Sequence, residues 1–141
     1  MQTSILNLVV NACDAMPGGG TLTIATANVT IQDHDRLAPG DYLAVSVSDS
    51  GNGMTNGVIE HAFEPFFTTK DIGKGSGLGL STVYGMVKQL GGDVTIVSST
   101  GRGSTIKPLL PWQAWLTRAP GLQLGKNRRA RRPNKMPRLR R

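Results

Sequence analysis

Residues 73–79 read Gly73-Lys-Gly-Ser-Gly-Leu-Gly79, with a glycine at every second position, and an apolar helical pattern follows at once. Glycine allows the main chain to adopt positive φ and to approach a ligand closely. The first amides of a helix are unpaired and carry a partial positive charge. A glycine loop that leads into a helix is therefore suited to bind phosphate. A plain mobile loop is the simpler explanation, and the residues before this loop decide between the two.

The rest of the chain alternates between helical and strand patterns. A long loop without any period, such as residues 64–77, is usually either a functional lid or disordered when it lies inside a compact domain. The predicted elements are a helix over 2–16, strands over 21–31 and 42–48, a short helix over 57–63, the loop over 64–77, a helix over 78–90, and strands over 93–99 and 103–110.

The charge is divided unevenly along the 141 residues, which suffice for one domain. The net charge is +7, but all nine acidic residues lie in residues 1–117, and ten of the sixteen Lys and Arg lie in residues 118–141. A nucleic-acid function for the whole chain is therefore not indicated. Residues 112–141 are rich in Arg and Pro without apolar periodicity, which predicts a disordered basic tail. Non-specific nucleic-acid binding by this tail remains an alternative function.

The compartment signals are simple. A single cysteine, Cys13, excludes an intramolecular disulfide and fits a reducing environment. No apolar run approaches the ~20 residues of a membrane span, and the first residues do not resemble a signal peptide. We expect a cytoplasmic polypeptide, whose longer parent protein could be anchored in a membrane.

Three groups of polar residues lie at the edges of predicted elements. Asn7, Asn11 and Asp14 share one face of the first helix, and amide oxygens are ligands that suit Mg²⁺. A solvated helix face is the simpler explanation. Asp49 ends a strand before Gly51 and Gly53, where a carboxylate could accept a hydrogen bond from an adenine amine. A β-turn is the simpler explanation.

The third group surrounds the glycine loop. The backbone amides of the loop, with the ammonium groups of Lys70 and Lys74, could hold a triphosphate. Phe63, Phe66 and Phe67 could fasten a movable lid to the domain, although ordinary core packing explains them as well. No window satisfies the dinucleotide-binding, P-loop or calcium-loop patterns.

Together these motifs resemble the ATP-binding catalytic domain of sensor histidine kinases, in the GHKL ATPase superfamily, over about residues 3–111. They match its N, G1, F and G2 boxes in the expected order. The matching segments are Asn7-Leu-Val-Val-Asn11-Ala-Cys-Asp14-Ala-Met16, Asp49-Ser-Gly51-Asn-Gly53-Met54, Phe63-Glu-Pro-Phe66-Phe67-Thr-Thr-Lys70 and Gly73-Lys-Gly75-Ser-Gly77-Leu78-Gly79-Leu80-Ser-Thr-Val-Tyr84-Gly85.

The resemblance implies an α/β two-layer sandwich, a mixed β-sheet with helices on one face. It implies that residues 1–111 form this domain, incomplete at the N-terminus, and that residues 64–76 form a lid over ATP. Asn11 is implied to coordinate Mg²⁺ and Asp49 to bind adenine. The other implied nucleotide-binding residues are Asn7, Asp14, Gly51, Gly53, Phe63, Phe67, Lys70, Lys74, Gly75, Gly77, Leu78 and Gly79.

Such kinases phosphorylate a histidine on a separate helical dimerisation domain and pass the phosphoryl group to a response regulator. Neither His34 nor His61 has the sequence context of a phosphoacceptor, so we expect the histidine-bearing dimerisation domain to lie outside this chain. The resemblance also implies a separate response regulator and a homodimeric parent kinase. An ATPase of the same superfamily with a non-kinase role is an alternative. It is disfavoured because Leu6 and Val10, not glutamate, precede the two asparagines.

Overall fold

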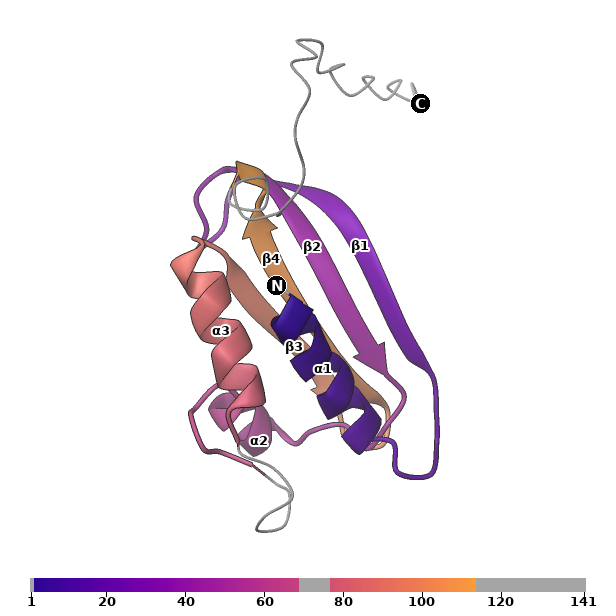
Figure 1. The fold of residues 1–141 in the computed structure, drawn as a ribbon. Coiled ribbons are helices and arrows are strands. Elements are labelled where there is room, and N and C mark those ends of the chain that lie inside the picture. Colours follow the sequence, from indigo (N-terminus) through magenta and orange to yellow (C-terminus); the bar gives the residue numbers. More distant parts are fainter. Residues whose placement is uncertain (1, 69–76, 114–141) are drawn as a thin grey trace, which may run out of the picture.

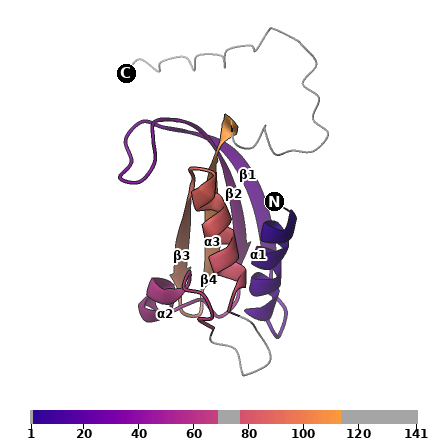
Figure 2. The same cartoon turned by 60° about the vertical axis from the view of Figure 1, so that its left-hand side comes forward.

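The computed structural model describes residues 2–68 and 77–113, which form two helices packed on one face of a four-stranded sheet (Figure 1). A short third helix lies at one end of the sandwich, beside the start of α3 (Figure 2). The elements are α1 (Gln2–Asp14), β1 (Leu22–Ile31), β2 (Gly40–Asp49), α2 (Asn56–His61), α3 (Gly79–Gln89), β3 (Asp93–Ser99) and β4 (Gly103–Pro111). The predicted helices and strands are thus all present, with ends shifted by at most two residues.

The sheet has the strand order β1-β2-β4-β3, and all three described pairings are antiparallel. The two-layer sandwich with helices on one face is confirmed, but the expected mixed pairing is not found among the described strands. The reason is the position of β4. Strands β2 and β3 run in the same direction and are joined by the segment that contains α2 and α3, yet β4 lies between them. The two parallel strands are therefore never neighbours.

The core lies between the helices and the sheet. Leu8 and Ala12 on α1, and Val83 and Val87 on α3, are each spaced by four residues and point at the sheet. Val83 and Val87 are completely buried. They pack against buried aliphatic residues of the strands, which are Val47, Val94, Ile106 and Leu110. This aliphatic core agrees with the low aromatic content of the sequence.

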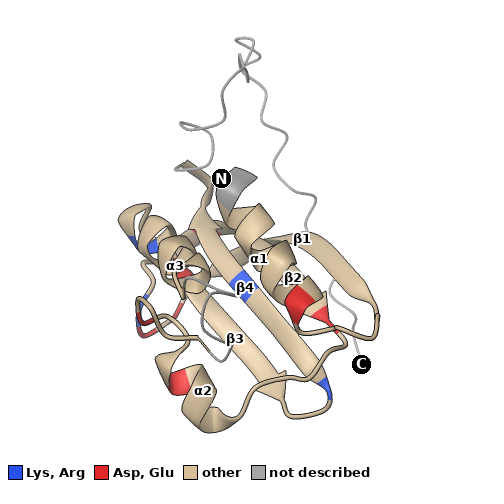
Figure 3. Cartoon of the chain, turned by 60° about the horizontal axis from the view of Figure 1, so that its bottom comes forward, with Lys and Arg blue, Asp and Glu red and all other residues tan. Residues whose placement is uncertain are grey.

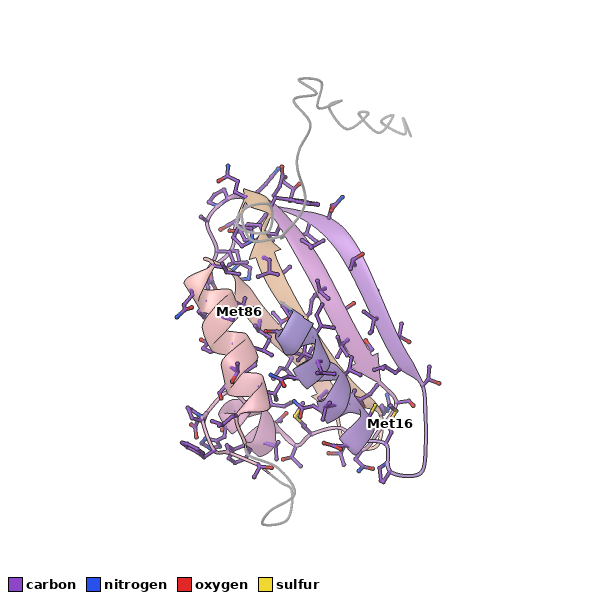
Figure 4. All side chains as sticks on the ribbon, in the orientation of Figure 1. Met16 and Met86 are labelled. Atoms are coloured by element: carbon purple, nitrogen blue, oxygen red, sulfur yellow. The ribbon has the colours of Figure 1, made fainter. Side chains whose placement is uncertain are left out.

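Helix α1 is tied to its neighbours at both ends (Figure 4). Near its start, the hydroxyl of buried Ser4 donates to the sulfur of Met86 on α3, at 3.2 Å. Just beyond its end, the hydroxyl of Ser50 donates to the sulfur of Met16, at 3.6 Å. Both contacts fix the helix relative to α3 and to the loop after β2. None of the helices that the structure describes has the length and apolarity to cross a lipid bilayer.

Candidate functional site

A cavity of about 580 Å³ opens between α1, the end of β2, the α2 segment and the start of α3. Three parts of the sequence that lie far apart in the chain meet there. Eight of the site residues indicated by the sequence line this cavity, namely Asn7, Asn11, Asp14, Asp49, Gly53, Phe67, Gly77 and Gly79. The polar face of α1, the turn after β2 and the end of the glycine loop are therefore brought to one place.

The asparagine face of α1 lies directly beside the start of α3. A Cβ atom on Gly79 would lie 3.4 Å from Asn11 Nδ2 and 3.8 Å from Asn7 Cβ. These are ordinary contact distances for a Cβ atom, so Gly79 and the asparagine face lie close together with room for no more than a methyl group between them. The side chain of Asn11 is consequently placed next to the first turn of α3, where unpaired amides are expected.

The turn after β2 is folded tightly against the end of α1. Asp49 Oδ1 accepts a hydrogen bond from the amide of Gly51, at 2.9 Å, which is the turn bond that the simpler explanation predicts. The amide of Asn52 donates to the carbonyl of Ala15 at 3.0 Å, and a Cβ on Gly51 would lie only 2.2 Å from that carbonyl oxygen. The hydrogen bond between Asp49 and the Gly51 amide also holds the Asp49 carboxylate at the cavity wall. Asp49 can therefore form the turn and bind a ligand at the same time.

The segments on either side of the undescribed residues 69–76 are joined by their backbones. The amide of Phe66 donates to the carbonyl of Gly77 at 3.0 Å, and both residues have positive φ, 66° and 69°. A Cβ on Gly77 would lie 2.5 Å from the carbonyl carbon of Phe66. Position 77 therefore requires glycine, both because its φ is positive and because a side chain would collide with the backbone of Phe66. Lys70, Lys74 and Gly75, which the sequence assigned to the phosphates, lie outside the described residues.

The three phenylalanines do not form one cluster. The ring of Phe63 stacks on Tyr84 of α3, with centroids 4.7 Å apart, and it does not line the cavity. Phe66 is 75% exposed, and only Phe67 reaches the cavity wall. Phe63 therefore anchors the segment to α3 through its contact with Tyr84.

Two other residues that the sequence indicated do not line the cavity. Gly51 packs against the end of α1, as described above, and Leu78 is the residue before the first turn of α3. The carbonyl of Leu78 accepts the amide of Thr82 at 2.9 Å, as at the start of a helix. Whether either residue touches a ligand through its backbone stays a prediction.

The cavity carries little charge of its own. Of its described lining residues, only Asp14 and Asp49 are ionisable, and both are acidic. Most of the described ribbon is likewise free of charged side chains (Figure 3). A bound polyphosphate would therefore need a metal ion, or the lysines of residues 69–76, for neutralisation.

Comparison with known proteins identifies the family. The family model for histidine kinase-, DNA gyrase B- and HSP90-like ATPases matches residues 1–114. The chain belongs to this family. It is 50% identical over 111 residues to the sensor kinase CckA of Brucella abortus, an alignment that covers 75% of this chain and 12% of CckA. The chain thus spans a small part of the length of this curated relative.

Solved structures of this ATPase family agree with the fold. A mycobacterial sensor histidine kinase, MprB, superposes with a TM-score of 0.60 and 26% identity, over 77% of this chain and 68% of that chain. Full-length ShkA in complex with AMPPNP superposes with a TM-score of 0.60 and 25% identity, over 77% of this chain and 20% of that chain. Within the ATPase family, the chain corresponds to the ATP-binding catalytic domain of sensor histidine kinases.

One cavity residue of this ATPase domain escaped the sequence reasoning. Ser104 on β4 lies opposite Asp49 in the strand register, is 8% exposed and lines the cavity. Its hydroxyl is 2.7 Å from the hydroxyl of Ser98, which accepts the amide of Met54 at 2.8 Å. Ser104 belongs to a strand 55 residues further along the chain, and only the β2–β4 register reveals that it faces Asp49.

Proposed function

We propose that this chain binds Mg-ATP and presents the γ-phosphate to a histidine carried by another domain or chain, as the catalytic part of a two-component sensor kinase. The observation that carries the proposal is the convergence of Asn11, Asp49 and Gly77 on one cavity. In this proposal residues 1–111 form the functional domain and residues 112–141 a basic tail. The dimerisation domain and the response regulator are separate partners.

Asp49 and Ser104 would bind the adenine end of the nucleotide. The carboxylate is oriented by the Gly51 amide, so the other carboxylate oxygen can accept from the exocyclic amine. The adjacent Ser104 hydroxyl belongs to a hydroxyl pair and can donate or accept. Apolar side chains of the same cavity, including Val47 and Ile106, give the flat base an apolar wall. This combination of apolar lining and few fixed polar groups is typical of ligand sites.

The Asn7–Asn11 face would serve the phosphate end. Neutral amide oxygens, with water and phosphate oxygens, are the donor set that Mg²⁺ accepts. The described residues contain no cluster of three His, Cys, Asp or Glu that could hold a metal alone. The donor set therefore fits a metal ion that arrives with the nucleotide. Bound Mg²⁺ supplies charge neutralisation at the phosphates, while Asn11 holds and orients the complex next to the amides of α3.

Phosphoryl transfer in such a site depends on positioning and electrostatics. The chain's own contribution is to hold adenine at the β2 end and the phosphates at the α3 end. Neither His34 nor His61 lines the cavity, which supports an external acceptor. His34 Nδ1 accepts the backbone amide of Arg36 at 3.0 Å, and His61 pairs with Glu64 at 2.8 Å. We expect ATP binding without appreciable autophosphorylation by this chain alone.

Asn11→Ala tests the proposed role of the amide. We expect wild-type chain to bind an ATP analogue more tightly with Mg²⁺ than with EDTA. The variant should lose most of this Mg²⁺-dependent increment, about 1–2 kcal/mol, because one ligand to the metal complex is removed. Fluorescence titration of a labelled ATP analogue measures both affinities. Asn28→Ala on exposed β1 is the matched control and should behave like wild type. Equal increments in wild type and Asn11→Ala would contradict the metal role.

A non-kinase ATPase remains the alternative, and the same preparation separates the two functions. The described cavity lining contains no glutamate that could act as a general base for water. We therefore expect negligible phosphate release from ATP by the chain, and phosphoryl transfer only when a histidine-bearing dimerisation domain is added. Steady phosphate release without any acceptor would favour the ATPase.

A further inference from the structure

The chain that follows α2 folds into consecutive turns that bring three side chains together. The amide of Glu64 donates to the carbonyl of His61 at 3.0 Å, and the amide of Phe67 donates to the carbonyl of Glu64 at 3.2 Å. His61, Glu64 and Phe67 are thereby spaced by three residues in turns that each close a backbone hydrogen bond. Of these three residues, Phe67 lines the nucleotide cavity, whereas His61 and Glu64 do not.

These three side chains are in contact. His61 Nδ1 lies 2.8 Å from Glu64 Oε1, and the imidazole lies 5.6 Å from the Phe67 ring, centroid to centroid, at 37°. Phe67 is partly buried and forms part of the cavity wall, whereas the His61 side chain is half exposed. An exposed imidazole, held by a carboxylate, thus packs against an aromatic ring that lines the cavity.

We propose that the His61–Glu64 pair positions Phe67 at the cavity wall, and that the protonated form of His61 tightens nucleotide binding. The inference rests on the proposed nucleotide site. An imidazolium is attracted to the face of an aromatic ring, and its bond to a carboxylate is charge-assisted and stronger than the neutral bond. Protonation therefore restricts Phe67 to one position, and a wall that is ordered beforehand lowers the entropic penalty of binding.

The charges around His61 determine the direction of its pH response. The hydrogen bond to Glu64 and the charge of Glu64 raise the pKa of His61 above its ordinary 6.5, with a smaller contribution from Glu60. Both neighbours are acidic and lie on or just after α2. The nearest described cation on α3, Lys88, instead contacts the Tyr84 ring and Asp93. Lys70, Asp71 and Lys74 lie outside the described residues.

The sign follows from this upward shift. Folding favours protonated His61, so the stability from this pair is complete below pH 6.5 and disappears as the pH rises through the raised pKa. If protonation also favours the binding-competent position of Phe67, nucleotide affinity falls over the same pH range. Binding must in turn raise the pKa of His61 further, because such linkage is reciprocal.

The test uses the full 141-residue chain and an Mg²⁺ complex of a non-hydrolysable ATP analogue, titrated between pH 6 and pH 9. We expect the ratio of wild-type affinity to that of His61→Gln to fall about two- to fivefold across this range. His61→Gln should bind with the weaker affinity throughout, and His61→Arg with the tighter affinity throughout. The nucleotide's own phosphate also titrates near pH 6, but this contribution is common to all variants and cancels in their ratio.

His34→Gln is the matched control, because His34 lies in the loop between β1 and β2 and does not line the cavity. It should keep the wild-type profile. NMR titration of the His61 ring supplies a second readout, which a purely structural role would not change. Its pKa should rise when nucleotide binds and fall towards 6.5 in Glu64→Gln.

The possible results distinguish a failure of the positioning role of His61 from a failure of the nucleotide site itself. Parallel pH profiles for wild type and His61→Gln, or a His61 pKa that nucleotide leaves unchanged, would overturn the positioning role while leaving the nucleotide site intact. A wild-type chain that binds no nucleotide at any pH would overturn this inference and the proposed function together.

Discussion

Replacing Asp49 with alanine is expected to weaken ATP binding by about 1–3 kcal/mol, or roughly five- to 150-fold. The adenine amine would then lose the carboxylate that accepts its hydrogen bond at the cavity wall. Isothermal titration calorimetry of the purified chain with the Mg²⁺ complex of an ATP analogue measures the change directly. The effect should be smaller for GTP, whose base carries a carbonyl where adenine carries the amine.

Asp49→Asn separates binding from folding. Asparagine retains an oxygen that can accept the Gly51 amide, now bonded to Asp49 Oδ1 at 2.9 Å, but it replaces the other oxygen with an NH₂ group. We expect this variant to be about as stable as wild type in urea and yet to bind ATP as weakly as Asp49→Ala. If Asp49→Asn bound ATP like wild type, the carboxylate would serve only the turn.

Replacing Gly53 with alanine is expected to destabilise the fold by about 2–5 kcal/mol, a large share of the ~5–15 kcal/mol typical of a domain. Two effects add. Gly53 has φ of +70°, where a side chain is strained by about 1–2 kcal/mol. Its Cβ would also overlap the backbone carbonyl oxygen of Ser99, at 1.9 Å, and overpacking adds about 1–3 kcal/mol. Urea unfolding followed by circular dichroism measures the difference.

Two other glycines separate these effects. Gly101 has a similar φ of +79° but nothing within 4 Å of its Cβ position, and Gly18 has neither the positive φ nor a neighbour. We expect Gly101→Ala to lower stability by about 1–2 kcal/mol and Gly18→Ala to change it little. Equal losses for Gly53→Ala and Gly101→Ala would show that the turn does not pack against β3 as described.

Much of the fold was accessible from the sequence because its periodicities are clean. The four-residue spacing of Val83 and Val87 indicates the buried face of α3, and the alternation of residues such as Val45 and Val47 is typical of a strand such as β2. The resemblance of the motifs to those of sensor histidine kinases also implies that Asn11, Asp49 and Gly77 belong to one site. Local patterns of this kind are fixed by neighbours in the chain.

The remainder depended on contacts between distant segments. The insertion of β4 between β2 and β3 is a tertiary arrangement, so the antiparallel pairing of the described sheet and the position of Ser104 opposite Asp49 could not be deduced. The fate of the phenylalanines was also undetermined. Phe63 packs on Tyr84 and Phe66 is exposed. The positive φ of Phe66 is a property of the folded backbone that the sequence does not indicate.

The most direct test of the nucleotide site is an amide NMR titration of the isotope-labelled chain with the Mg²⁺ complex of a non-hydrolysable ATP analogue. If these residues share one nucleotide site, the resonances of the Asn11 side-chain amide and of the backbone amides of Asp49, Gly53 and Gly77 will shift along one binding curve, with one dissociation constant. The amide resonances of the loop formed by residues 32–39 should not shift. If one of these groups shifts while the others do not, or if none shifts at saturating nucleotide, the three elements do not form a common ATP site.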